Sequence, residues 1–144
     1  METKIDKLIS LSMQIGKFMM HQTNATFEER AATMLQAHVL SFLTKNPNAK
    51  SSEIAKYLNA SLSSTTQLIE RMHKANLISR IGDKTDRRVI HHVITPEGKE
   101  KLKQMREAKR TRMKKLFASI DAQDVDELIR IQEKIVKGLA EETK

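Results

Sequence analysis

The sequence predicts a mainly α-helical chain with a small β-hairpin, and three observations support this prediction. Apolar residues recur at spacings of three and four along most of the chain, which is typical of amphipathic helices. A three-residue break, Asn59-Ala60-Ser61, separates two helical runs. Two short β-branched runs, residues 77–81 and 89–94, then flank a polar tip and indicate antiparallel strands. Together these features predict a helix-turn-helix followed by a hairpin wing.

Two helices are expected before this module. The first covers residues 2 to about 22, and its apolar stripe is widened by Leu11 and Phe18. The second begins at about Phe27 or Ala31 and ends at Lys45, because Pro47 and its flanking Asn residues favour a turn. Its predicted buried face is formed by Leu35, Val39, Phe42 and Leu43.

The helix-turn-helix itself is predicted from caps and periodicity. Ser51 and Ser61 each have a hydroxyl that suits the N-cap of a helix. The second helix of the pair has an apolar face at spacings of three, four and seven, formed by Thr65, Leu68, Ile69 and Met72. Asn76 then suits the left-handed position that follows a helix end.

Two more helices are expected after the hairpin. Thr95 is the predicted N-cap of the fifth, with Pro96 in the first helical position, and this helix continues to about Ser119. Asp121 is the predicted cap of the sixth, which continues to about Ala140.

We therefore expect a single chain, 1–144, with a winged helix-turn-helix region at 31–95 and dimerisation helices at 1–25 and 96–144. The apolar stripes of the terminal helices need a partner surface, and a homodimer supplies one.

Composition limits the function further. The chain has 144 residues, no cysteine and a formal net charge of +8. The charge is concentrated in Lys99–Lys115 and Lys50–Arg88, which favours a polyanionic partner. Aromatic residues are few, so duplex DNA is a better candidate than single-stranded nucleic acid. Without cysteine there is no disulfide or zinc-thiolate site. The absence of a long apolar run predicts no membrane span and a cytoplasmic location.

The predicted DNA contacts lie on the second helix of the pair and on the wing. Short hydroxyl and amide side chains suit base edges and phosphates, and arginine suits a phosphate or guanine. The helix candidates are Ser61, Ser63, Ser64, Thr66, Gln67 and Arg71. The wing candidates are Lys84, Asp86, Arg87 and Arg88. Adjacent strand residues point to opposite sides, so one of the two wing arginines is expected to enter the minor groove.

Other sites have weaker signals. Adjacent residues His91 and His92 diverge on a strand, so no metal site is expected, and no cofactor is expected. Met13, Met34 and His38 are candidates for an adaptable effector pocket, although core packing is the simpler interpretation of the methionines. The sequence contains no glycine-rich phosphate loop, cysteine nucleophile or carboxylate pair, so an enzyme is not expected.

The chain resembles the multiple-antibiotic-resistance regulator (MarR) family of dimeric winged-helix transcription factors. Three stretches carry the likeness: Ser52-Glu53-Ile54-Ala55 with Leu58, Ser64 to Arg80, and Asp86-Arg87-Arg88 followed after five residues by Ile94-Thr95 with Gly98. The last resembles the family pattern Asp-x-Arg-x5-Leu-Thr, with Ile94 in place of Leu. Asn76 replaces the family's usual glycine.

The resemblance implies a homodimer that binds a pseudo-palindromic operator and represses transcription until a small aromatic or anionic effector releases it. It also implies that Asp86 orients the wing, which we expect to occur through an ion pair, while an arginine contacts DNA. Two alternatives stay open from the sequence. One is a winged-helix module for protein interactions, and the other is an activator or counter-silencer with the same fold.

Overall fold

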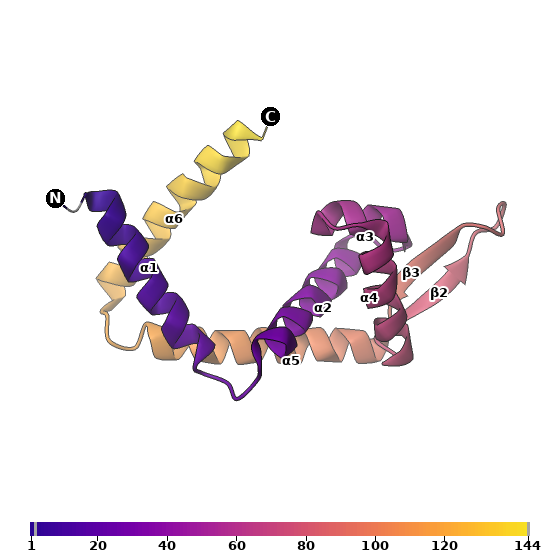
Figure 1. Cartoon of the computed structure of the whole chain (residues 1–144), viewed down its shortest axis with the longest axis horizontal. Helices are drawn as coiled ribbons and strands as arrows, with labels where there is room; N and C mark the ends of the chain where they lie inside the picture. The colour runs from indigo at the N-terminus through magenta and orange to yellow at the C-terminus, as the bar shows by residue number, and fades with distance from the viewer. Residues whose placement is uncertain (2, 144) are drawn as a thin grey trace. The chain divides into compact units, whose positions relative to one another are not determined.

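The structure is a computed structural model that describes residues 1 and 3–143 (Figure 1). Its elements are α1 (Lys4–Met20), α2 (Phe27–Lys45), β1 (Ala49–Lys50), α3 (Ser51–Leu58), α4 (Leu62–Lys74), β2 (Ile78–Gly82), β3 (Ile90–Ile94), α5 (Pro96–Leu116) and α6 (Ala122–Glu142). The chain forms two compact units. We call Thr23–Ala108 the central unit, and Met1–Gln22 with Lys109–Lys144 the terminal unit. The predicted order of helices and hairpin strands is confirmed.

The central unit contains a small antiparallel sheet with the strand order β1-β3-β2. The hairpin pairs Ile78 with Ile94 and Gly82 with Ile90, as expected for two strands joined at a tip. The third strand, β1, was not predicted. It pairs Ala49 with His92 on the other edge of β3, so the segment before α3 is attached to the base of the wing.

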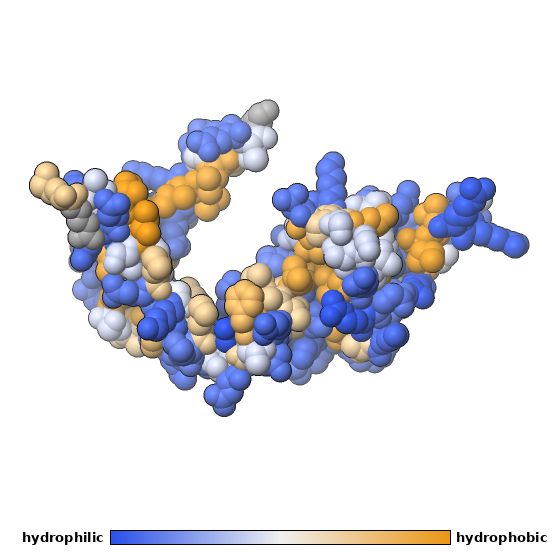
Figure 2. All heavy atoms as spheres, in the orientation of Figure 1, coloured by the Kyte–Doolittle hydropathy of each residue, from blue (hydrophilic) through white to orange (hydrophobic). Residues whose placement is uncertain are grey.

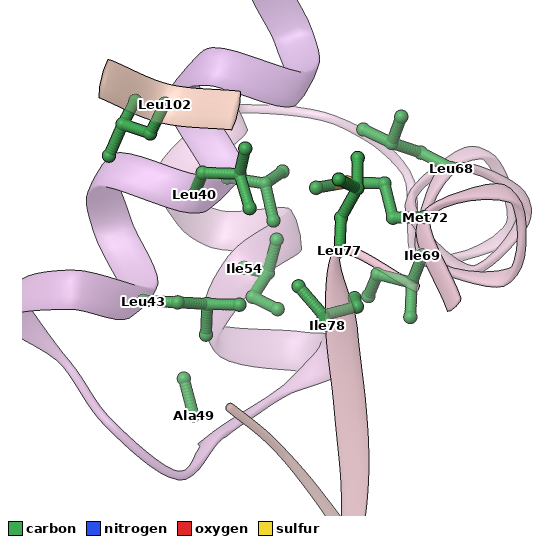
Figure 3. Close-up of a cluster of buried hydrophobic side chains, with 11 residues drawn as sticks. Leu40, Leu43, Ala49, Ile54, Leu68, Ile69, Met72, Leu77, Ile78 and Leu102 are labelled. Carbon is green, nitrogen blue, oxygen red and sulfur yellow. The ribbon is translucent and has the colours of Figure 1, made fainter. Parts of the chain in front are cut away.

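Helices α2, α3 and α4, the sheet and the start of α5 share one apolar core (Figure 3). Its members are Val39, Leu40, Leu43, Ala49, Ile54, Leu68, Ile69, Met72, Leu77, Ile78 and Leu102. The predicted face of α2 was partly wrong, because Leu35 is 38% exposed while Leu40 is fully buried. Packing against the sheet and α3 rotates the buried face of α2 toward Leu40.

The cap of α3 also differs from the prediction. The N-cap position is Lys50, whose backbone N–H donates to the Glu53 carboxylate over 2.7 Å. Ser51 is instead the first residue of the helix, and its Oγ lies 2.9 Å from Nε2 of His92. His92 on β3 therefore binds the Ser51 hydroxyl that was predicted to cap the helix.

The start of α5 is joined closely to the end of α4. Asn76 has a φ of 58°, the left-handed conformation that was predicted. Thr95 caps α5 as predicted, because its Oγ1 accepts from the Gly98 N–H over 2.9 Å and donates to the Asn76 carbonyl over 2.7 Å. A Cβ on Gly98 would lie only 2.0 Å from the carbonyl oxygen of Leu77. Only glycine allows the two segments to approach this closely.

The terminal unit has a different character. Neither α1 nor α6 contains a buried residue, and apolar side chains are exposed on both helices, as the orange areas on them in Figure 2 show. Asp121 caps α6 as predicted, accepting from the Asp124 N–H over 2.8 Å. None of the helices in the described residues is long and apolar enough to cross a membrane.

The contact between Gly98 and Leu77 leads to a stability prediction. Replacing Gly98 by Ala should lower the free energy of unfolding by roughly 2–3 kcal/mol, because the backbone carbonyl cannot move aside for the new methyl group. Urea denaturation would measure the loss. The matched control is Gly82→Ala, since a Cβ there meets nothing within 4 Å and should change stability little. Equal stability of the two variants would contradict the close approach.

Candidate nucleic-acid interface

The rotation of α4 about its own axis is set by four buried side chains. Thr65, Leu68, Ile69 and Met72 are all 5% exposed or less, which confirms the predicted inner face. The opposite face therefore points to solvent and presents Ser63, Gln67 and Arg71. These three side chains make no hydrogen bond or ion pair with the described residues, so they are available to a ligand.

The other three predicted residues of α4 have local partners. Ser61 is the N-cap, and its Oγ accepts from the Ser64 N–H over 3.1 Å. The hydroxyl of Ser64 lies 2.8 Å from that of Ser61, and the Thr66 hydroxyl donates to the Leu62 carbonyl over 2.8 Å. These hydroxyls stabilise the first turn of the helix, while their exposed oxygens can still accept a hydrogen bond.

An ion pair joins α4 to the wing. Glu70 on the exposed half of α4 pairs with Arg80 on β2, and both side chains are about half exposed. This contact was not predicted, because it depends on how the hairpin packs beside the helix rather than on local spacing. Solvent weakens such a pair energetically, but its geometry ties the direction of β2 to that of α4.

The tip of the wing is organised by two aspartates. Asp83 accepts from the N–H and hydroxyl of Thr85 and from the N–H of Asp86, over 3.0, 2.7 and 3.0 Å. The carboxylate of Asp86 accepts from the backbone N–H of Arg88 over 2.9 Å. The expected ion pair of Asp86 was wrong, because within the described residues its carboxylate is used to fix the backbone of the turn.

The basic side chains of the wing are left free by this arrangement. Lys84, Arg87 and Arg88 are exposed and have no side-chain partner among the described residues. Figure 2 shows the tip as a hydrophilic projection. The acidic residues of the tip bind its own backbone, and the basic residues point outward, so the tip presents positive charge to a partner.

A shallow groove lies beside the wing, with a volume of about 320 Å³. It is lined by Lys50, Ser51, Ser52, Leu62, Arg88, Val89 and Ile90. The groove thus brings together the starts of α3 and α4 and the base of the wing. Lys50 and Arg88 place positive charge on its walls, which suits a phosphate group.

The adjacent histidines of β3 point to opposite sides, as expected. His92 faces inward, is 3% exposed, and lies between two partners. Its Nε2 is 2.9 Å from the Ser51 hydroxyl, and its Nδ1 is 3.1 Å from Nε2 of His73. Burial, together with the positive charges of neighbouring His73 and Arg80, lowers the pKa of His92 to about 4. His92 is therefore neutral at physiological pH and connects α3, α4 and β3.

His91 faces the other way and contacts the wing tip. Its Nε2 is 2.9 Å from a carboxylate oxygen of Asp83, and its Nδ1 is 2.7 Å from the backbone carbonyl of Asn48. The hydrogen bond to Asp83 raises the pKa of His91, and the same bond is the main reason that the pKa of Asp83 lies below its usual range. Sequence reasoning missed this contact, because it joins residues on three different segments.

The predicted effector residues are placed as follows. Met34 and His38 lie one turn apart on the exposed side of α2 in the central unit, and Met13 is exposed on α1 in the terminal unit. The ring of His38 lies 6.5 Å from that of Tyr57, which stacks on Phe42 at 4.5 Å. No group of three or more His, Asp or Glu residues in the described part of the chain could hold a metal ion.

The buried position of His92 leads to a pH prediction. Its pKa is lowered from 6.5 to about 4 on folding, so the unfolded chain binds the proton more readily between these values. The free energy of unfolding should therefore fall as the pH is lowered from about 6.5 toward 4, by roughly 2–3 kcal/mol in total. Denaturant titrations across this range would measure the loss.

The control for this prediction is a pair of variants. His92→Gln keeps hydrogen-bonding capacity without a titrating ring, so the acid-dependent loss should shrink. His21→Gln, which removes an exposed histidine of the terminal unit, should keep it. An unchanged acid dependence in His92→Gln would contradict the assigned role.

The comparisons with known proteins agree with this geometry. Residues 32–90 match the model of the MarR family. The HTH-type transcriptional repressor MdtR of Bacillus subtilis (strain 168) is 27% identical over 113 residues, which are 78% of this chain and 73% of that protein. The crystal structure of YusO from Bacillus subtilis has a TM-score of 0.71 and 26% identity, covering 91% of this chain and 90% of the other.

A third comparison concerns the fold alone. A mutant of S. aureus MepR, solved bound to an oligodeoxyribonucleotide, has a TM-score of 0.61 over 95% of this chain and 98% of its own. The two sequences are 17% identical.

Proposed function

We propose that this chain, whose residues 32–90 match the MarR family model, is a DNA-binding transcription regulator that acts as a homodimeric repressor of a pseudo-palindromic operator. In this proposal each protomer inserts α4 into a major groove and the wing into the neighbouring minor groove. A small aromatic or anionic effector releases the DNA. The observation that carries the proposal is that, among the described residues, Ser63, Gln67 and Arg71 on α4 and the basic side chains of the wing tip are exposed and have no side-chain partner.

The face of α4 supports base reading. Ser63 and Gln67 lie about one turn apart on the exposed side, and Arg71 follows one turn later. A glutamine amide can form two hydrogen bonds with adenine, and a serine hydroxyl can donate or accept. We assign these two residues to base edges and Arg71 to a phosphate or a guanine. Ser61, Ser64 and Thr66 complete the contact at the start of the helix.

The wing and the groove support backbone contacts. Arg88 lies on the wall of the groove, while Arg87 and Lys84 project from the tip. We assign one arginine to the minor groove and Lys84 to a phosphate, and Asp86 acts indirectly by holding the turn. Lys50 and the two serines that follow it line the same groove and suit a phosphate between the two DNA grooves.

The terminal helices support a homodimer. The exposed apolar residues of α1 are Ile5, Leu8, Ile9, Leu11, Met13, Ile15, Phe18 and Met20, and those of α6 are Ile129, Ile131, Ile135, Val136 and Leu139. Apolar surface of this extent favours burial against another chain. A second copy supplies a matching surface, and a two-fold axis then relates two α4 helices as a palindromic operator requires.

Repression of transcription and release of DNA by an effector are the most specific parts of the proposal. Repression is supported by the relative MdtR, which is named a transcriptional repressor. For the effector we assign Met34 and His38 on α2, because methionines adapt to aromatic ligands and a histidine can pair with an anion. Met13, the third candidate, lies on α1 in the terminal unit.

The central test is selection of bound duplexes from a random pool by the purified full chain, with the mass of the complex measured by light scattering. We expect enrichment of a two-fold symmetric motif and a complex that contains two chains. A reporter placed behind the selected motif then measures the sign of regulation. A stable monomer without sequence preference would refute the proposal, and a reporter that rises with the protein would refute repression.

Arg88 provides a specific prediction. Its replacement by Ala should weaken binding of the selected duplex by about 1–3 kcal/mol, because a charged contact in a groove is lost while none of the described residues bonds this side chain. Fluorescence anisotropy at physiological salt would measure the change. Lys137→Ala removes the same charge from the exposed polar side of α6 and should leave affinity nearly unchanged. Equal affinities of the two variants would refute the role of Arg88.

The salt dependence of DNA affinity provides a second specific prediction. If each protomer neutralises phosphates with Arg71, Lys84, Arg87 and Arg88, a dimer neutralises about eight, and the logarithm of the binding constant should fall with the logarithm of salt with a slope on the order of −7. Titrations at several salt concentrations measure this slope. A flat profile would mean that the basic surface does not contact DNA.

A further inference from the structure

The ring of His91 connects three segments of the central unit. It lies on β3, its Nδ1 is 2.7 Å from the carbonyl oxygen of Asn48, and its Nε2 is 2.9 Å from Oδ1 of Asp83. Asn48 precedes β1, and Asp83 is in the tip of the wing. The side chains of His91 and Asp83 are 19% and 27% exposed, so this contact is partly shielded from water.

Both atoms that face the ring are hydrogen-bond acceptors. A backbone carbonyl has no proton to give. One oxygen of Asp83 accepts from the N–H and hydroxyl of Thr85 and from the N–H of Asp86. These bonds, together with the one to His91, hold the pKa of Asp83 below its usual range, so the side chain is a carboxylate. A neutral imidazole has one N–H and cannot donate to both acceptors. The arrangement therefore requires the doubly protonated, positively charged form of His91.

The charges around the ring agree with this assignment. Asp83 is the negative group that faces it, and its hydrogen bond is the largest cause that raises the pKa of His91. Lys50 on β1 opposes the positive charge, with a smaller effect. His92 on the same strand faces the core and stays neutral, because burial lowers its pKa.

We propose that His91 is a positioning residue of the wing, whose cationic form holds the Asp83 end of the tip on the Asn48 carbonyl and thereby makes DNA affinity dependent on pH. The proposal rests on the proposed DNA-binding function. When His91 loses its proton, one of its two hydrogen bonds is lost and a lone pair faces an acceptor. The link between the tip and the Asn48 carbonyl is then broken, and Arg87 and Arg88 must be ordered again when DNA binds.

The direction of the effect follows from linkage. The pKa of His91 is raised in the folded protein, so the contact is complete below the ordinary value of 6.5 and is lost as the pH rises through the raised value. Phosphates near the tip favour the cation further. Affinity for DNA should therefore decrease as the pH rises through this range.

The first experiment needs no DNA. The ring protons of the five histidines are followed by NMR in the full chain as the pH is raised, with His91 assigned from the spectrum of His91→Gln. We expect His91 to titrate above 6.5 and to shift downward in Asp83→Asn, whose amide oxygen can still accept from Thr85 and Asp86. A His91 that titrates at or below the ordinary value would overturn the proposal.

The second experiment measures affinity for a fluorescein-labelled duplex selected from the random pool. Between about pH 6.5 and pH 8.5 the binding constant of the wild-type chain should fall roughly three- to tenfold. His91→Gln and Asp83→Asn should vary less than about twofold over the same range. His21→Gln, which removes a histidine of the terminal unit, should retain the wild-type profile.

The outcomes separate this inference from the function on which it rests. Absence of duplex binding at every pH would refute the proposed function, while the NMR titration would still test the charge of His91. Binding with a flat profile in the wild-type chain, or an equal pH dependence in wild type and His91→Gln, would refute the positioning role and leave the DNA-binding function intact.

Discussion

Burial of one face of α4 against the core determines what the rest of this surface can do. A helix with four buried side chains at spacings of three and four cannot rotate without exposing them, so its opposite face is fixed as well. Because Leu68 and Met72 are buried in the core, α4 exposes Ser63, Gln67 and Arg71 to solvent. In the proposed complex, recognition would therefore depend on apolar packing, and a change in the core under α4 would alter DNA contact without changing any of the proposed contact residues.

The wing uses its charges in two different ways. Its acidic residues are turned inward, where Asp83 and Asp86 accept hydrogen bonds from the tip's own backbone. Its basic residues are left outside, where an anion can reach them. A tip with the same composition but an ion pair between Asp86 and a neighbouring arginine would have used up its positive charge internally.

Much of this organisation was predictable because it depends on local chemistry. Ser61 as a cap, the left-handed conformation of Asn76 and the start of α5 at Thr95 each follow from a side chain and its near neighbours. The buried face of α4 follows from periodicity. Only part of the candidate interface was found this way, since residue types predict exposure on a helix but not the partners that a hydroxyl selects.

The errors share another cause, which is contact between distant segments. Strand β1 has two residues, too few for any alternation to be visible, and it forms because β3 offers a free edge. Ser51 bonds His92 rather than capping α3, and Asp83 rather than Asp86 forms the ion pair of the wing tip. In each case the register of β3 selects the partner, and that register is set by tertiary packing.

The close fit of Gly98 on Leu77 has a mechanical consequence. The Thr95 hydroxyl donates to the Asn76 carbonyl, and there is no room for a methyl group on Gly98. The first turn of α5 and the last turn of α4 are therefore expected to move as a rigid unit. A contact that is packed this closely transmits displacement from one segment to the other. A displacement of the first turn of α5 would therefore move the end of α4 with it, and with α4 the polar face that we propose contacts DNA.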